Sequence, residues 1–277
     1  MSRFVSALAR PRPVDGPVAD LDGMPLRMHP LVLGWEPIPE SLSLHGGSAS
    51  TFLLEPVTAA VVVYADGWVL LDSGFDVDAL ADPAIRRARF VHGSYNPVVP
   101  PGDPLLEQVA ALGLSWRDLR AVGISHVHFD HTGGLRLVAP GIPVLLQRAE
   151  WEYAATGAVV AANPSEFRRS GLDVVLAEGD TELAPGLWAL DTAGHTPGHQ
   201  SFAVSLPGQR IVLACDAADL HVNVTGPTRC GSTERPEDAA AAQRAIERLA
   251  ELDAAEGTTV WPAHDPDWPG WREHTVA

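Results

Sequence analysis

Three histidines and one aspartate lie within six consecutive residues of the segment 124–134. The segment reads Ile-Ser-His-Val-His-Phe-Asp-His-Thr-Gly-Gly, which places His126, His128, Asp130 and His131 close together in the chain. Neutral imidazoles and carboxylates are the ligands that zinc and similar divalent metals prefer. A single surface histidine usually has no such role, but this density predicts a metal site.

The residues around the cluster predict how it is positioned. Residues 119–125 are largely apolar, as in a short buried strand, and the glycine pair after the histidines permits an unusual backbone turn. Side chains alternate along an extended chain, so His126 and His128 point to the same side. Asp130 and His131 follow the bend and can turn toward a second position. We therefore expect one loop to begin two metal sites.

Metal-binding residue types also follow three later apolar segments. These residues are His195 after 187–194, Asp216 after 210–215 and His264 after 258–263. Loops at one end of a rigid sheet are a common place for chemistry. We therefore expect the three side chains to gather beside the first cluster.

A hairpin is predicted earlier in the chain. Residues 59–64 and 68–72 flank Asp66-Gly67, which is a strong two-residue turn signal, and both arms are almost wholly apolar. Such arms are typical of a sheet that is covered on both faces. The second arm ends at Asp72, which is either a turn residue or a carboxylate that supports a metal ligand by hydrogen bonding.

The rest of the pattern predicts one domain. Helices are expected at 104–113, 148–155 and 236–254, and further strands at 142–147 and 201–206. Residues 75–103 are expected to form a long irregular loop, a wall of a substrate pocket, and 156–186 carry no clear pattern. Residues 1–25 are expected to be a loosely ordered N-terminal arm. Nothing marks a boundary after it, so 26–277 are predicted to form a single domain.

The composition limits the classes of partner. The 277 residues carry 19 basic and 35 acidic side chains, a net charge of −16, which argues against nucleic acid and anionic membranes as partners. We find no transmembrane run and no signal peptide in the sequence. Two cysteines do not form a disulfide framework, and a cytoplasmic location is expected.

The candidate site residues resemble, in order and spacing, the motif of the metallo-β-lactamase superfamily. The matching residues are His126-x-His128-x-Asp130-His131, Gly194-His195, Asp216 and His264, with Asp72 at the place of a supporting aspartate. The resemblance extends from about the Asp66-Gly67 hairpin to His264. It implies an α/β fold, an αββα sandwich with the site at one sheet edge.

Within that superfamily, three strings are similar to the N-acyl homoserine lactonases, which are quorum-quenching enzymes. They are Ser-His-Val-His-Phe-Asp-His-Thr-Gly-Gly at 125–134, Gly-His-Thr-Pro-Gly-His-Gln-Ser at 194–201, and Ala-His-Asp at 263–265. The second string is the least specific, because glyoxalase II-like hydrolases share most of it.

The resemblance implies two divalent metal ions per chain, with zinc preferred and manganese, iron and cobalt as alternatives. One ion would be held by His126, His128 and His195. The other would be held by Asp130, His131 and His264. Asp216 would bridge both ions together with a hydroxide. His199 is not a ligand in this pattern and is expected to have a supporting role.

One residue departs from the lactonase pattern. Lactonases of this group carry a tyrosine three residues after the bridging aspartate, where it polarises the substrate carbonyl, but this chain has Asp219 there. A carboxylate does not stabilise a developing oxyanion unless it is protonated. His221 is an alternative donor. The departure leaves metal binding intact and opens the question of the substrate.

The resemblance implies a dinuclear metal-dependent hydrolase that opens a lactone or related ester by attack of the metal-bridging hydroxide. Asp130 and Asp216 are the candidate catalytic residues, with Asp130 orienting the nucleophile or transferring its proton. The expected partner is a small-molecule lactone or ester, without nucleic acid or membrane, and a homodimer is suggested.

Four alternatives stay open on the sequence. A glyoxalase II-like thioester hydrolase would share the fold but need a basic pocket for a glutathione-type anion. A mononuclear iron oxygenase, similar to persulfide dioxygenases, would need only the first set of ligands. A β-lactamase or a non-catalytic metal-binding scaffold would also use the motif.

Three tryptophans lie close to His264 in the chain, at positions 261, 268 and 271. Trp261, Trp268 and Trp271 either pack in the core or line a pocket for an apolar substrate.

Overall fold

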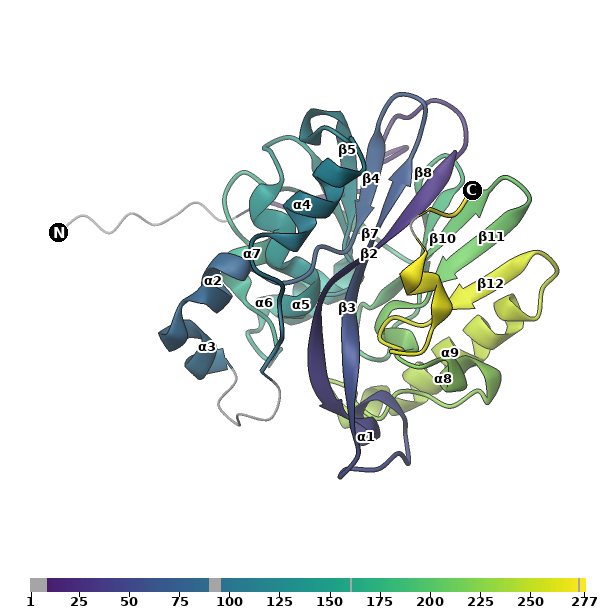
Figure 1. Cartoon of the computed structure of the whole chain (residues 1–277). Coiled ribbons are helices and arrows are strands. Elements are labelled where there is room, and N and C mark those ends of the chain that lie inside the picture. The colour runs from purple at the N-terminus through teal and green to yellow at the C-terminus, as the bar shows by residue number, and fades with distance from the viewer. Residues whose placement is uncertain (1–8, 90–95, 160, 274) are drawn as a thin grey trace.

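A computed structural model describes residues 9–89, 96–159, 161–273 and 275–277. Two β-sheets pack face to face, and helices cover their outer faces (Figure 1). The first sheet has the order β1-β7-β6-β5-β4-β3-β2, and the second has the order β12-β11-β10-β9-β8. This arrangement is the predicted αββα sandwich.

The first sheet combines a long hairpin with a parallel part. Its strands are β1 (Arg12–Pro13), β2 (Arg27–Pro39), β3 (Phe52–Val63), β4 (Trp68–Leu71), β5 (Leu119–Gly123), β6 (Pro143–Gln147) and β7 (Asp173–Ala177). The predicted hairpin is present, because β3 and β4 pair antiparallel around Asp66-Gly67. Strands β4 to β7 run parallel, so the ends of β4 and β5 meet at one edge.

The second sheet is antiparallel except at its last pair. Its strands are β8 (Thr181–Ala184), β9 (Leu187–Asp191), β10 (Gln200–Leu206), β11 (Gln209–Leu213) and β12 (Thr258–Trp261). Strands β11 and β12 are parallel neighbours. The residues that follow them in the chain therefore emerge side by side.

Helices lie on both outer faces of the sandwich. Those near the first sheet are α1 (Glu40–Ser43), α2 (Val77–Ala81), α3 (Pro83–Arg89), α4 (Pro104–Ala111), α5 (Phe129–Thr132), α6 (Arg148–Ala155) and α7 (Pro164–Phe167), and those near the second are α8 (His221–Thr225) and α9 (Ala239–Asp253). Short 3-10 helices are η1 (Trp116–Asp118), η2 (Gly133–Leu137), η3 (Cys215–Ala217), η4 (Pro236–Asp238) and η5 (Pro269–Arg272).

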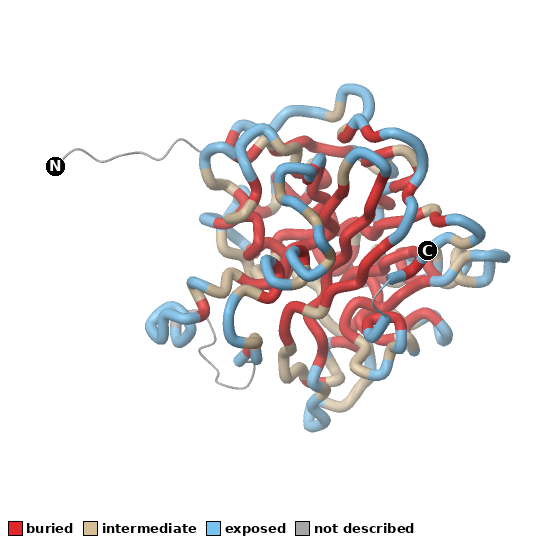
Figure 2. Tube along the Cα trace, turned by 45° about the horizontal axis from the view of Figure 1, so that its top comes forward, coloured by how far each residue is buried: buried red, intermediate tan, exposed pale blue. Residues whose placement is uncertain are grey.

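Apolar side chains fill three layers between these elements, and the buried residues follow the strands through the middle of the molecule (Figure 2). Leu70 and Val122 pack toward the helices of the first sheet. Val69 and Phe202 belong to the layer between the two sheets. Alternate residues of a strand thus enter different layers, as the pleat requires.

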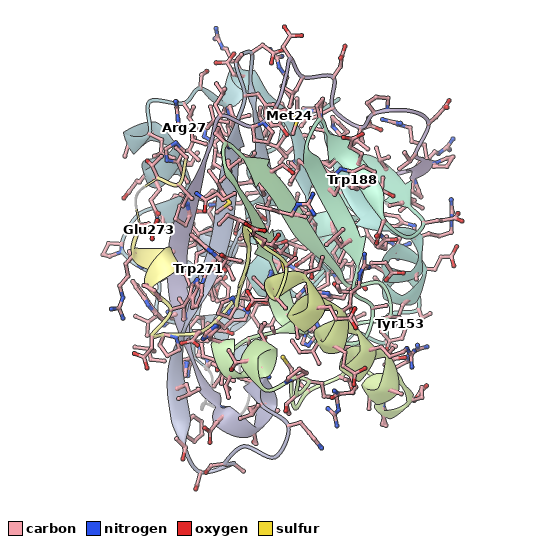
Figure 3. All side chains as sticks on the ribbon, turned by 90° about the vertical axis from the view of Figure 1, so that its right-hand side faces the viewer. Met24, Arg27, Tyr153, Trp188, Trp271 and Glu273 are labelled. Atoms are coloured by element: carbon pink, nitrogen blue, oxygen red, sulfur yellow. The ribbon has the colours of Figure 1, made fainter. Side chains whose placement is uncertain are left out.

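The longest helix, α9, closes the outer face of the second sheet (Figure 3). Ala242, Ile246 and Leu249 share its buried face, as the sequence spacing predicts. Trp188, on the outward face of β9, stays 41% exposed.

Two sequence expectations differ from the structure. The part of the N-terminal arm that is described is packed rather than loose, because Arg12–Pro13 pairs with β7 and Ala19 and Leu21 are buried. Residues 1–8 lie outside the described residues. The segment 75–103 is not wholly irregular, because it contains α2 and α3; each is too short to show a sequence period.

The tryptophans near the C-terminus pack in the core. Trp261 and Trp271 are buried between the sheets, with ring centroids 5.4 Å apart, and Trp268 packs against them. This arrangement favours the packing interpretation over a substrate wall. Within the part of the chain that the structure describes, no helix has both the length and the apolar character needed to cross a membrane.

Candidate metal centre

Five loops that follow strands of the two sheets meet at one end of the sandwich. Asp72 follows β4, His126 follows β5, and His195 lies between β9 and β10. Asp216 follows β11, and His264 follows β12. The structure brings together all seven residues that were predicted as metal ligands, in two adjoining groups.

The first group consists of His126, His128, His195 and Asp216, whose ligand atoms all lie within 4.8 Å of one another. Nε2 of His126 is 3.6 Å from Oδ2 of Asp216, and Nε2 of His195 is 3.4 Å from the same oxygen. Nδ1 of His128 lies 3.1 Å from Nε2 of His195. Two imidazole nitrogens thus face one carboxylate oxygen, and the third lies beside them.

The second group consists of Asp130, His131 and His264, and it meets the other oxygen of Asp216. Nε2 of His131 is 3.1 Å from Oδ2 of Asp130 and 3.2 Å from Oδ1 of Asp216. Nε2 of His264 is 3.1 Å from Oδ1 of Asp216. The carboxylate of Asp216 therefore presents one oxygen to each group.

The side chains of this centre fit divalent metal ions. Nε2 of His126 is buried and makes no hydrogen bond to any described residue. A buried polar atom left without a partner costs about 1–3 kcal/mol, and a bound metal ion would remove that cost. The donor set of imidazole nitrogens and carboxylate oxygens suits zinc, manganese, iron or cobalt.

Burial keeps the histidines of the first group in the form that binds metals. Burial lowers the pKa of His126 well below its usual value, and it lowers the pKa of His195 to about 4. Both imidazoles are therefore neutral at neutral pH, with lone pairs free for coordination.

The second group holds positive charge instead. Burial acts to lower the pKa of His131, but Asp130 and Asp216 outweigh it, and the pKa is raised well above its usual value. Burial likewise acts to lower the pKa of His264, and Asp216 outweighs it. The carboxylates of this group therefore favour a positive charge beside them.

Asp72 and Cys215, which lie near the candidate ligands, both have the left-handed backbone conformation that residues other than glycine usually avoid. Asp72 has a φ of 55° and Cys215 has a φ of 48°. The bend at Asp72 lets its carboxylate accept from the backbone N–H of Ser125 at 2.7 Å and from Nδ1 of His131 at 3.0 Å. Asp72 thereby orients His131, the supporting role that the sequence allowed; such strain clusters at functional sites.

Glu150, which sequence reasoning missed, joins the two histidine loops. One oxygen of this buried carboxylate accepts from the backbone N–H of Val127 at 2.9 Å. The other accepts from Oγ1 of Thr196 at 2.7 Å and from the backbone N–H of Gly198 at 3.1 Å. A lone glutamate in a helix carries no sequence signal for such a contact.

Glu234 was also missed, and it orients one ligand. Oε1 of Glu234 lies 2.9 Å from Nε2 of His128, and the Glu234 backbone N–H donates to the His195 carbonyl at 2.9 Å. On the other side of the centre, Nδ1 of His264 donates to the carbonyl of Pro56 at 2.8 Å. Such partners fix which ring nitrogen faces a metal ion.

His199 and His221 lie outside the two groups. Nδ1 of His199 is 2.9 Å from Oγ1 of Thr192, and its ring packs 5.3 Å from that of His126, which agrees with a supporting place. The ring of His221 lies 4.7 Å from the ring of Trp268. Asp219, at the position of the tyrosine in lactonases, is buried beside Asp216 and His264.

Comparisons with known proteins agree with this geometry. The model of the metallo-beta-lactamase superfamily matches residues 53–264. The N-acyl homoserine lactonase AttM of Azorhizobium caulinodans is 29% identical over 244 residues, which cover 84% of this chain and 90% of that protein. An N-acyl homoserine lactonase of a Bacillus species is 29% identical over 215 residues, covering 76% of this chain and 81% of that protein.

Solved structures also resemble this fold, and one of them has a bound product. It is an N-acyl homoserine lactone hydrolase with the product N-hexanoyl-L-homoserine bound at its catalytic metal centre. It has a TM-score of 0.77 and 25% sequence identity, and the likeness covers 88% of this chain and 95% of that one.

Proposed function

The chain belongs to the metallo-beta-lactamase superfamily, and we propose that it is a dinuclear metal-dependent hydrolase that opens N-acyl homoserine lactones or a related ester. The curated relatives named above are lactonases, and they are matched over most of their length. The seven candidate ligands of this chain lie together in two adjoining groups.

The carboxylate of Asp216 is the observation that carries the proposal. Its Oδ2 faces His126 and His195, whereas its Oδ1 faces the second group. A carboxylate with one oxygen toward each of two ligand groups is suited to bridge two ions. This argues against the mononuclear alternative, for which the second group would have no task.

The two groups imply a division of work. His126, His128 and His195 would hold one ion, and Asp130, His131 and His264 the other, with zinc as the preferred metal. Divalent ions bound there supply a Lewis acid for the acyl oxygen and a nucleophilic water of lowered pKa. Because each histidine has a neighbour that orients its ring or a buried environment that keeps it neutral, little rearrangement is needed to bind.

Asp130 is the residue that we assign to proton transfer. It begins the second group and is 8% exposed, so bulk water has little access to its carboxylate. A carboxylate accepts a proton from the attacking water and returns it to the ring oxygen as the acyl C–O bond breaks. Water is thereby added across that bond, and the alcohol and the acid remain on one product molecule.

The substrate panel that tests the proposal contains three compounds. Metal-loaded protein is offered N-hexanoyl-L-homoserine lactone, γ-butyrolactone and a glutathione thioester, and proton release is followed at constant pH. Turnover of the acyl homoserine lactone, absent from the metal-free protein and from Asp130→Asn, is the expected result. Turnover of the thioester alone would favour the glyoxalase II-like alternative instead. Turnover by metal-free protein would refute both hypotheses, because both need a metal ion.

A further inference from the structure

Asp219 has an oxygen that no described residue satisfies. The residue is 6% exposed, and its buried Oδ1 makes no hydrogen bond within the described part of the chain. A buried acceptor without a partner costs about 1–3 kcal/mol. Such a cost is expected where a ligand completes the site.

The backbone holds Asp219 against the second group. The N–H of Ala263 donates to the carbonyl of Ala218 at 3.0 Å, and the N–H of His264 donates to the carbonyl of Asp219 at 2.9 Å. Two successive bonds tie residues 218–219 to 263–264. On its other side, the Asp219 N–H contacts Sγ of Cys230 at 3.4 Å. The backbone that carries the Asp219 side chain is therefore fixed beside the second group.

A carboxylate oxygen of Asp219 lies within 4.8 Å of the ligand atoms of both Asp216 and His264, and all three residues are buried. We propose that Asp219 is an additional ligand of the second metal ion, at the position where lactonases carry a tyrosine. This inference rests on the dinuclear centre of the proposed function and adds to it a ligand that belongs to this chain.

The added ligand makes the two sites chemically different. The first site has three imidazoles and one shared carboxylate. The second would combine two groups that share His264, Asp130 with His131 and Asp216 with Asp219, so it would have two imidazoles and three carboxylates. Carboxylate-rich sites suit harder ions such as manganese better than imidazole-rich sites do. We therefore expect the preference for zinc over manganese to be weaker at the second site than at the first.

Two further carboxyl groups stand on the same side of the centre. Glu36 and Glu55 face each other across β2 and β3. Glu36 interacts electrostatically with Asp130, and Glu55 interacts with His264 and Asp216. The second site thus lies beside two further acidic groups.

The test measures metal affinity on full-length protein. Metal-free protein is titrated with manganese and, separately, with zinc against a competing chelator, and bound metal is counted by elemental analysis. In Asp219→Asn, the affinity of the second site for manganese is expected to fall at least about tenfold, because loss of residues that only support ligands already costs 10–100-fold. Zinc is expected to lose less, and the first site is expected to be unchanged.

Asp265→Asn is the matched control. Asp265 follows His264 and is outside the three candidate ligand groups, so this variant removes the same charge without a proposed ligand. Its second-site affinity for manganese is expected to stay close to that of the wild type. An equal loss of manganese affinity in both variants, or no loss in Asp219→Asn, would overturn the ligand assignment. Either result would leave the proposed function in place, provided that the wild type binds two ions.

A crystal structure of the metal-loaded wild type gives an answer that does not depend on any variant folding. The expected result is an oxygen of Asp219 at roughly 2.0–2.2 Å from the second ion, the usual metal–carboxylate distance. An Asp219 that points away from that ion would refute the assignment. A wild type that binds fewer than two ions would overturn both this inference and the dinuclear centre.

Discussion

The carboxylate of Glu234 lies 2.9 Å from Nε2 of His128. This contact fixes the imidazole so that its other nitrogen, Nδ1, faces His195 in the first ligand group. Both side chains are largely buried, with exposures of 12% for His128 and 8% for Glu234. The orientation of this candidate ligand is thus set by a residue 106 positions away in the chain.

We predict that Glu234→Gln weakens metal binding at the first site. The amide keeps the shape of the side chain but loses the charge that makes His128 a better ligand, so affinity should fall about 10–100-fold. Glu237→Gln, on the same segment with a side chain 69% exposed, is the control and should bind as the wild type does. Equal affinities in the two variants, measured by competition with a chelator, would refute the orienting role of Glu234.

Loss of the Glu150 carboxylate is predicted to cost a large part of the stability. Glu150→Ala leaves three donors, from Val127, Thr196 and Gly198, without their acceptor, so the free energy of unfolding should fall by about 3 kcal/mol or more. Glu152→Ala, an exposed neighbour in α6, should change it by less than about 0.5 kcal/mol. Urea unfolding of both variants measures this free energy, and a small decrease in Glu150→Ala would refute the prediction.

Gly198 is predicted to tolerate no side chain. A Cβ there would lie 2.0 Å from the backbone nitrogen of Glu150, an atom that cannot move without displacing α6. Gly198→Ala should therefore lower both stability and the metal content of purified protein, because the loop that carries His195 must shift. Gly226→Ala, where the carbonyl oxygen of Val222 would lie an ordinary 3.6 Å from the new Cβ, is the comparison. Full metal content in Gly198→Ala would show that the loop adapts.

The ion pair between Asp180 and Arg248 gives a prediction for pH. Hydrogen bonding with Arg248 lowers the pKa of Asp180, so its contribution to stability is present above the unfolded pKa, about 4, and is lost as the pH falls through the folded pKa. The side chains are 41% and 37% exposed, so we expect about 1 kcal/mol or less.

The variant that tests this pair is Arg248→Ala. Its deficit in unfolding free energy, relative to the wild type, should shrink as the pH is lowered from about 7 toward about 3. Arg244→Ala, an exposed arginine of the same helix, should show no such trend. A deficit that does not depend on pH would mean that Arg248 acts through packing or through its bond to the Asp191 carbonyl.

Local patterns predicted much of the fold. Helix α6 has the bounds expected from the sequence, 148–155, and α4 begins at the proline that was expected to start it. The cluster 126–131 is local too, because four of the seven candidate ligands are neighbours in the chain. The fold class follows from these patterns and from the family, whereas metal binding by the seven residues stays a prediction.

Features that depend on distant contacts could not be predicted. Strand β2 spans 13 residues, but Pro30, Pro37 and Pro39 obscure its pattern; they are tolerated because β2 lies at the edge of its sheet. Strands β7 and β8 lie in the segment 156–186, where no pattern was clear. Glu150 and Glu234 act through side chains that meet only after folding, so their spacing in the sequence carries no signal.

Titration of metal-free protein with zinc, with the hydrolysis of N-hexanoyl-L-homoserine lactone followed at each step, shows how many ions the activity needs. We predict that the rate rises until two ions are bound per chain and that Asp216→Asn, which disturbs the carboxylate shared by both groups, remains inactive at every metal level. A rate that reaches its maximum at one ion per chain, or that needs no metal, would contradict this prediction.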